Sequence, residues 1–232
     1  MIGQLLRGHY KIIKLLSQGG FGHTYIAEDT KMPDNRQCVV KQLQPASSDP
    51  NCLQVARRLF DLEAKTLAKL GNHGQIPQLL AFFEENQQFY LVQELIQGHP
   101  LTDELLPGQP WTQKQAIDLL IDLLAVLDFV HQNGVIHRDI KPANLIRRNV
   151  DNKLVLIDFG AVKQVTASGD DPSQPKRSTG IYSMGFAPPE QIKGAAVYPS
   201  TDLYALAVTC LNLLTGKEAH ELYDTYQDCW DW

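Results

Sequence analysis

The 232-residue sequence has few cysteines, no excess of basic residues and no long uninterrupted apolar run. Its four cysteines form no C-x-x-C pair and have no histidine at ligand spacing, which excludes a disulfide-stapled mini-protein and argues against a zinc site. We expect reduced, mostly buried thiols, as in a cytoplasmic protein. The net charge of −5 argues against a nucleic-acid-binding protein, which would normally carry a basic face.

Segments that could enter a membrane are also missing. The first seven residues contain no sustained apolar run of the kind found in signal peptides. The richest apolar stretch, 117–130, is interrupted by three aspartates, so we expect no membrane contact within this chain. Glycine and proline, at 16 and 13 residues, are near average, which excludes a low-complexity chain. The length allows one large domain or two small ones with a proper core.

The first hundred residues read as short strands with one helix. The pattern predicts a helix over 53–70, with Val55, Leu59, Leu62, Thr66 and Leu70 as its apolar stripe and Gly71 as its end. Runs rich in β-branched and aromatic residues, separated by turn residues, predict strands at 10–16, 24–28, 37–43, 78–83 and 88–95.

The remainder of the chain is mainly helical, after a segment rich in helix breakers near 97–110. Thr112 and Gln115 form a capping-box start, and the helix that follows ends at Asn133-Gly134. One face of this helix carries Ile117, Leu120, Ile121, Leu124, Leu127 and His131. Short strands are expected at 135–136, 145–146 and 154–157, followed by a long loop over 160–198. The last predicted helix covers 202–214, with Thr201 as its N-cap and Gly216 just past its end. The predicted fold class is α+β.

A glycine-rich turn, 17–22, joins the first two predicted strands. Gly19, Gly20 and Gly22 have no side chains, so their backbone N–H groups can approach phosphate oxygens closely. This signal is weak alone, because a plain β-turn would look the same. Lys41 on the next strand strengthens it, since Glu63 on the following helix could hold its ammonium toward a phosphate. The alternative is that both are ordinary surface charges.

A second segment, His137-Arg138-Asp139-Ile140-Lys141-Pro142-Ala143-Asn144, is followed by Asp158-Phe159-Gly160. This many polar residues, on irregular backbone between short strands, would not form an apolar core. Asn144 and Asp158 offer the oxygen ligands that divalent metal ions prefer. Asp139 can orient a hydroxyl group and accept its proton, and Lys141 can balance charge on a transferred group.

These strings, at this spacing, resemble the protein kinases of the Ser/Thr type. The resemblance covers the chain from about Tyr10 onward, and Glu190-Gln191 after two prolines is similar to bacterial members. It implies one kinase domain over 1–232 with the bilobal kinase fold. The N-lobe, about 1–96, would be a small antiparallel β lobe with one helix, and the C-lobe, 97–232, would be larger and mainly helical.

The resemblance also implies the ligands and the residues that hold them. ATP would lie between the lobes, with Mg²⁺ (Mn²⁺ as an alternative) held by Asn144 and Asp158. Asp139 would be the catalytic base, assisted by Lys141 and by Lys41 with Glu63. The nucleotide would contact Leu16, Ser17, Gly19, Gly20, Phe21, Gly22, Thr24, Val39, Lys41, Glu94, Ile96, Ile146 and Ile157.

Further expectations concern regulation and the C-lobe. The implied partner is a protein substrate in bacterial signalling, with autophosphorylation in trans at Thr179 or Ser178. By alignment, Ser183 takes the place of a threonine that bonds the catalytic loop, and Asp202 the place of an aspartate that braces its backbone. Glu190 lacks the arginine partner seen in the family, and because a buried unpaired carboxylate is costly we expect a truncated C-lobe.

Two other functions remain open at this stage. One is a nucleotide-binding regulatory module without catalysis, against which the complete set of Lys41, Glu63, Asp139, Asn144 and Asp158 argues. The other is a small-molecule phosphotransferase of kinase-like fold. The Pro188-Pro189-Glu190 segment and the long loop before it favour a protein substrate over a small molecule.

Overall fold

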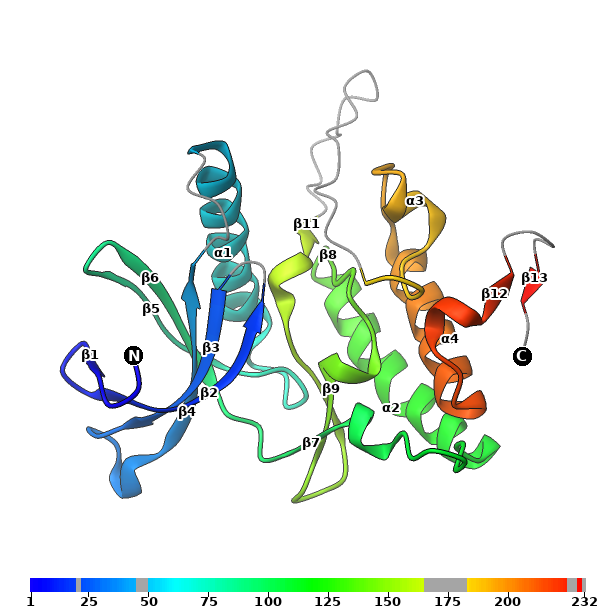
Figure 1. The fold of residues 1–232 in the computed structure, drawn as a ribbon, viewed down its shortest axis with the longest axis horizontal. Coiled ribbons are helices and arrows are strands. Elements are labelled where there is room, and N and C mark those ends of the chain that lie inside the picture. The colour runs from blue at the N-terminus through cyan, green and yellow to red at the C-terminus, as the bar shows by residue number, and fades with distance from the viewer. Residues whose placement is uncertain (20–21, 45–49, 165–182, 225–228, 231–232) are drawn as a thin grey trace. The chain divides into compact units, whose positions relative to one another are not determined.

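The computed structural model describes residues 1–19, 22–44, 50–164, 183–224 and 229–230 (Figure 1). The chain divides into two compact units, which we call unit 1 (Met1–Ile96) and unit 2 (Gln97–Trp232). Strands predominate over helices in unit 1 and helices over strands in unit 2, in agreement with the α+β class expected from the sequence. Among the helices of the described residues, none is long and apolar enough to cross a membrane.

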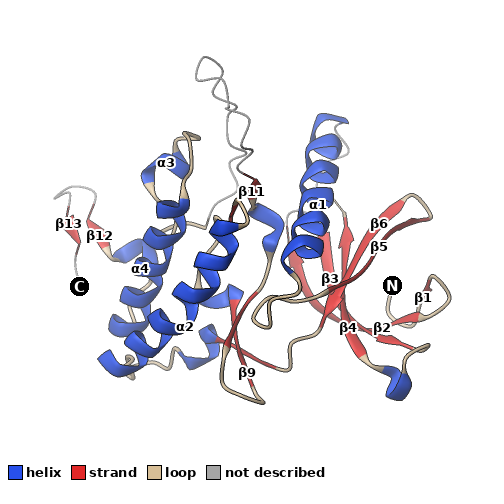
Figure 2. Cartoon of the chain, turned by 180° about the vertical axis from the view of Figure 1, so that it is seen from behind, coloured by secondary structure: helices blue, strands red, loops and turns tan. Residues whose placement is uncertain are grey.

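Unit 1 is a six-stranded antiparallel sheet with one long helix. The strand order is β1-β2-β3-β4-β6-β5. The helix α1 (Pro50–Leu70) contacts β4 and β5, and Figure 2 shows it lying against one face of the sheet. The strands are β1 (Leu5–Leu6), β2 (Tyr10–Gly19), β3 (Gly22–Asp29), β4 (Gln37–Leu43), β5 (Leu79–Glu85) and β6 (Gln88–Glu94), with a short helical turn η1 (Pro33–Asn35) before β4.

The apolar core of unit 1 explains why these segments form strands. Aromatic and β-branched side chains, which suit a pleated surface, alternate into the core from neighbouring strands. The cluster on the sheet consists of Leu6, Tyr10, Ile12, Tyr25, Ala27, Cys38, Val40, Phe83, Tyr90 and Val92. The rings of Phe83 and Tyr90 lie 5.4 Å apart, so cross-strand aromatic contacts add to the burial.

The glycine-rich turn is shorter than the sequence predicted. Pairing of β2 with β3 continues from Ser17 opposite Thr24 to Gly19 opposite Gly22. At Gly22 a β-carbon would overlap the carbonyl oxygen of Gln42 on β4. The sheet itself therefore requires glycine at position 22, because strand β4 approaches too closely for any side chain.

Unit 2 is built on two packed helices, α2 (Gln113–Gln132) and α4 (Pro199–Thr215). A three-stranded sheet of order β10-β9-β7 lies beside α2, and two strand pairs complete the unit. The short elements are β7 (Gly98–Pro100), η2 (Leu101–Glu104), β8 (Val135–Ile136), η3 (Pro142–Asn144), β9 (Leu145–Arg148), β10 (Leu154–Leu156), η4 (Phe159–Ala161), β11 (Lys163–Gln164), α3 (Pro189–Ile192), η5 (Ala219–Glu221), β12 (Tyr223–Asp224) and β13 (Cys229–Trp230).

Helix α2 begins as predicted but buries a different face. Thr112 is its N-cap, and the backbone N–H groups of Thr112 and Gln115 donate to each other's side chains as a capping box. The predicted face is wrong, since Ile117, Ile121 and Leu124 on it are exposed. The helix has apolar residues on more than one side, and its neighbours α4, β8 and β10 decide which side is covered. The buried residues are Ala116, Leu119, Leu123, Val126, Leu127 and Val130.

Helix α4 starts earlier than the sequence suggested. Its N-cap is Tyr198 and Pro199 occupies the first helical position, so the predicted N-cap Thr201 is wrong. Thr201 lies buried in the first turn, where its hydroxyl donates to Oε1 of Glu190 at 3.1 Å. Glu190 is therefore not an unpaired carboxylate, as the sequence led us to expect, because Thr201 bonds it in place of an arginine. The helix ends at Gly216, whose φ of 69° suits glycine.

Candidate active site

In unit 1 a lysine and a glutamate form an ion pair between a strand and a helix. Nζ of Lys41 on β4 lies 2.5 Å from Oε1 of Glu63 on α1, and the two side chains are 16% and 5% exposed. The structure thus brings together the two residues that the sequence paired across 22 positions. Replacing a buried ion pair by apolar residues is often neutral or stabilising, so such a pair is weak evidence for stability and better evidence for function.

The other predicted nucleotide contacts of unit 1 lie in several settings. Val39 is buried on β4, while Leu16 on β2 is 45% exposed. The backbone N–H of Glu94 already donates to the carbonyl of Gln78 at 2.9 Å, so it is not available to a nucleotide. Gly20 and Phe21 lie outside the described residues. Ser17, Gly19, Gly22 and Thr24 belong to β2 and β3, Ile96 is buried at the end of unit 1, and Ile146 belongs to β9 of unit 2.

In unit 2 the carboxylate of Asp139 is held by three side chains. Its Oδ1 accepts a hydrogen bond from the hydroxyl of Ser183 at 2.6 Å. Its Oδ2 accepts from Nδ2 of Asn144 at 2.8 Å and lies 2.9 Å from Nζ of Lys141. Lys141 also donates to Ser183 at 2.7 Å, which closes the network. Because a carboxylate oxygen can accept two donors, Oδ1 retains capacity for one more, such as a substrate hydroxyl.

The backbone around Asp139 is irregular and is held by Asp202 of α4. Oδ2 of Asp202 accepts the N–H of His137 at 2.9 Å, and Oδ1 accepts the N–H of Arg138 at 2.7 Å. The carboxylate also contacts Nε2 of His131 at 2.7 Å and is fully buried. This confirms the sequence-based expectation that Asp202 braces the loop. The contacts of Ser183 likewise confirm the bond expected from its alignment with a family threonine.

His137 links the loop to the segment that carries Asp158. Its Nε2 lies 3.1 Å from the carbonyl of Ile157, and its Nδ1 accepts the N–H of Asp139 at 3.3 Å. Burial lowers the pKa of His137, against the opposing effect of nearby aspartates. A neutral ring that donates through Nε2 and accepts through Nδ1 satisfies both contacts. The ring edge of His137 also packs on Phe159 at 4.7 Å between centroids.

Asn144 and Asp158 have the donor chemistry that a magnesium ion requires. The amide nitrogen of Asn144 is committed to Asp139, which leaves its oxygen to act as a ligand. Asp158 has a φ of 66°, an uncommon conformation for aspartate that recurs at functional sites. Among the described residues no cluster of three His, Cys, Asp or Glu side chains forms a metal cage. Mg²⁺ needs none, because it takes one or two protein ligands together with phosphates and water.

Comparison with known proteins identifies the family. The protein kinase domain family matches residues 10–229 of the chain. This chain belongs to the protein kinase family. The catalytic-loop network of unit 2 and the Lys41–Glu63 pair of unit 1 are therefore parts of a kinase domain, and the resemblance seen in the sequence is confirmed.

Three curated relatives of this chain are bacterial proteins. Serine/threonine-protein kinase F of Synechocystis sp. is 51% identical over 98% of this chain, and serine/threonine-protein kinase B of the same organism is 48% identical over 94%. Serine/threonine-protein kinase PrkC of Bacillus subtilis is 28% identical over 94% of the chain. The chain spans 48%, 38% and 32% of the length of these three relatives.

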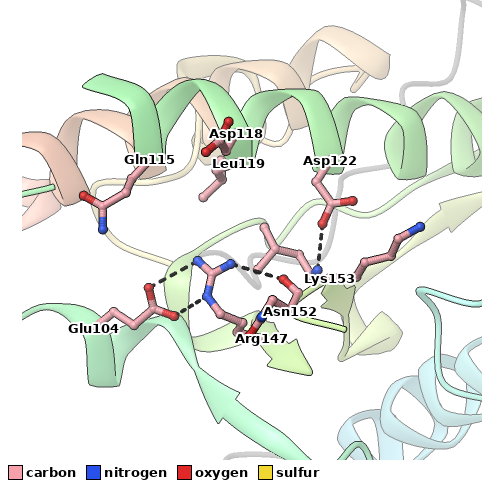
Figure 3. Close-up of a pocket in the computed structure, with 9 residues that line it drawn as sticks. Glu104, Gln115, Asp118, Leu119, Asp122, Arg147, Asn152 and Lys153 are labelled. Carbon is pink, nitrogen blue, oxygen red and sulfur yellow. Dashed lines mark hydrogen bonds and ion pairs between the residues drawn. The ribbon is translucent and has the colours of Figure 1, made fainter. Parts of the chain in front are cut away.

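A cavity of about 370 Å³ in unit 2 contains none of the predicted site residues of the kinase. It lies between α2 and the sheet that carries β9, and Figure 3 shows Arg147 bonded to Glu104 and Asp122 bonded to the backbone of the sheet. Nε of Arg147 pairs with Glu104 at 2.6 Å, and Asp122 accepts the backbone N–H of Leu154 at 2.7 Å. These contacts fasten η2 and β10 to their neighbours, which is a structural role.

The sequence missed two residues that help to hold the backbone around Asp139. His131 was assigned only to a helix face, yet it contacts Asp202. Gln191 was noted only as a bacterial feature, yet its Nε2 donates to the carbonyl of Arg138 at 2.8 Å. A glutamine directly after a glutamate in a loop-rich segment gives no sequence signal of burial. Its 2% exposure emerges only from the tertiary structure.

Proposed function

We propose that this chain is an ATP-dependent serine/threonine kinase domain with an N-lobe over 1–96 and a C-lobe over 97–232. The observation that carries the proposal is the network around Asp139, in which Lys141, Asn144 and Ser183 orient one carboxylate. Such a group suits phosphoryl transfer, where catalysis consists mainly of positioning and charge stabilisation. The names of the curated relatives support protein Ser/Thr residues as acceptors.

In the proposed reaction the substrate hydroxyl oxygen attacks the γ-phosphorus of ATP. A bond forms between that oxygen and phosphorus, the bond from phosphorus to the bridging β–γ oxygen breaks, and ADP leaves. Oδ1 of Asp139 orients the hydroxyl and receives its proton. Lys141, which lies 2.9 Å from Asp139, stabilises negative charge on the phosphoryl group in flight.

The other proposed site residues would bind the metal ion, the phosphates and the adenine of ATP. Asn144 and Asp158 would hold Mg²⁺, with Mn²⁺ as an alternative, and the ion would neutralise charge on the phosphates. Lys41, fixed by Glu63, would contact the α- and β-phosphates. The adenine contacts remain those proposed from the sequence, except that Glu94 would contribute its carbonyl oxygen and not its N–H.

Phosphate transfer from [γ-³²P]ATP to myelin basic protein tests the proposal. We expect the wild-type chain to label the substrate in the presence of Mg²⁺, and Asp139→Asn to lower kcat by about two to four orders of magnitude, the usual contribution of a general base. The matched control is Asp128→Asn on the exposed side of α2, where the aspartate accepts a hydrogen bond from Gln132. Full activity of Asp139→Asn would contradict the assigned base. Nucleotide binding without transfer by the wild type would favour a regulatory module.

We also propose that the kinase is cytoplasmic and phosphorylates itself in trans at Thr179 or Ser178. Both residues lie outside the described part of the chain. Support comes from Arg138, because an arginine directly before the catalytic aspartate is suited to bind a phosphate on the loop. Mass spectrometry after incubation with ATP and Mg²⁺ should detect a phosphate at one of the two positions. An unmodified loop in a fully active protein would contradict this part of the proposal.

A further inference from the structure

Arg138 has a backbone conformation that residues other than glycine rarely adopt, and it directly precedes Asp139. Its φ is 70°, in the left-handed region where a β-carbon is crowded by the backbone. Such a conformation persists only where the surrounding structure fixes it. The contacts that fix Arg138 therefore also fix the direction in which the side chain of Asp139 leaves the backbone.

The two peptide groups that flank Arg138 are held by different side chains. On the N-terminal side, Oδ1 of Asp202 accepts the N–H of Arg138 at 2.7 Å. On the C-terminal side, Nε2 of Gln191 donates to the carbonyl oxygen of Arg138 at 2.8 Å. In the same peptide plane, Nδ1 of His137 accepts the N–H of Asp139 at 3.3 Å. The Arg138–Asp139 peptide is thus bonded at both of its polar atoms.

The amide of Gln191 is buried and therefore needs hydrogen-bond partners. It lies on α3 and is only 2% exposed, and a buried amide lowers stability unless its polar atoms are bonded. Because a carbonyl oxygen can only accept, the amide must present its NH₂ group to Arg138. Ser183, Lys141 and Asn144 hold the carboxylate end of Asp139, whereas Gln191 acts on the backbone end of the same residue.

We propose that Gln191 is a positioning residue for phosphoryl transfer, which fixes the Arg138–Asp139 peptide plane and thereby the direction of the Asp139 carboxylate. This inference rests on the proposed function, in which Asp139 receives the proton of the substrate hydroxyl. Since a small misplacement of a reacting group costs a large factor in rate, loss of the bond lowers kcat and leaves the binding of substrates unchanged.

The first test replaces the donor without changing the size of the side chain. Gln191→Met should lower kcat by about ten-fold or more, with KM for ATP and for a substrate peptide within about two-fold of wild type. The matched control is Gln132→Met, which removes a 2.7 Å bond to Asp128 on the exposed face of α2 and should leave kcat unchanged. A folded Gln191→Met protein with wild-type kcat would overturn the proposal.

The second test restores the donor by protonation. In Gln191→Glu an ionised carboxylate cannot donate to the Arg138 carbonyl, whereas the protonated acid can. The activity of this variant relative to wild type should therefore rise as the pH falls from about 8 to about 6, while the ratio for Gln191→Met stays flat. A role in packing alone would not produce that difference, so a flat ratio for Gln191→Glu overturns the proposal.

Two further outcomes are decisive. If Gln191→Met unfolds, the activity of folded Gln191→Glu relative to wild type still tests the proposal through its change with pH. Unfolding of both variants would overturn a positioning role. If the wild type binds ATP but transfers no phosphate, the proposed function fails, and amide hydrogen exchange still tests the contact. Loss of the bond in Gln191→Met should speed exchange of the Asp139 N–H, and unchanged exchange would overturn the contact itself.

Discussion

The two units hold their candidate site residues with different kinds of structure. In unit 1, Lys41 and Glu63 are carried by a strand and a helix, whose own hydrogen bonds and apolar contacts fix the backbone. In unit 2, Asp139 lies on irregular backbone and is held by side chains distant in sequence. Ser183, 44 positions away, bonds its carboxylate, and Asp202 accepts the N–H groups of His137 and Arg138 from 65 and 64 positions away. Regular backbone carries a functional side chain unaided, whereas irregular backbone requires buried polar partners.

The largest effect should follow removal of the brace in unit 2. Asp202→Ala leaves the N–H groups of His137 and Arg138 buried without their acceptor. We expect the free energy of unfolding to fall by about 3–5 kcal/mol, as for loss of one partner of a buried polar network. Urea unfolding measures this change. Asp118→Ala is the matched control on α2, where the carboxylate forms an exposed pair with Lys114 and should contribute about 0.5 kcal/mol or less.

Removal of the ion pair of unit 1 should have a much smaller effect on stability. In the double variant Lys41→Met with Glu63→Leu, apolar side chains replace a pair that lies between regular elements. The free energy of unfolding should stay within about 1 kcal/mol of wild type, because such replacements are often neutral. Phosphate transfer should be lost, and Lys41→Met alone should also abolish it in a folded protein. If the double variant lost as much free energy of unfolding as Asp202→Ala, the two units would not differ in how far their stability depends on these polar contacts.

The sequence predicted most of unit 1 because its signals are local. Strand β4 has the predicted bounds, and the Lys41–Glu63 pair, for which the sequence left two ordinary surface charges as the alternative, forms in the structure. Local patterns failed where neighbours decide the outcome. The buried face of α2 depends on what packs against it. Thr201 has the residue type of an N-cap, yet it lies inside the first turn of α4, where its hydroxyl donates to Glu190.

The site of unit 2 was predicted only in part. The residues of the catalytic loop were found because their motif is specific, and the contacts of Ser183 and Asp202 followed from the family resemblance. No pattern in the sequence predicts that the side chain of Gln191 donates to the carbonyl of Arg138, or that the ring of His137 accepts the N–H of Asp139. Such contacts depend on a positive φ and on buried polar groups, which have no periodic signature in a sequence.

A smaller effect concerns pH and is also confined to unit 2. Burial lowers the pKa of His137 below its ordinary 6.5, although Asp202, Asp139 and Asp158 act in the opposite direction. Between the folded-state pKa and 6.5, the unfolded chain binds a proton that the folded chain does not, so the free energy of unfolding decreases as the pH falls. Urea unfolding at several pH values should show this slope. His137→Gln should flatten it, and an unchanged slope would contradict the neutral buried ring.

Amide hydrogen exchange of the catalytic loop tests most directly whether side chains make an irregular backbone rigid. If Asp202 holds this backbone rigid, the N–H groups of His137 and Arg138, which donate to it, should exchange as slowly as that of Leu123 in the buried face of α2. The amide of Val150, whose residue is 84% exposed in a turn, gives the rate of an unprotected loop. Exchange of His137 and Arg138 at the rate of Val150 would contradict the account.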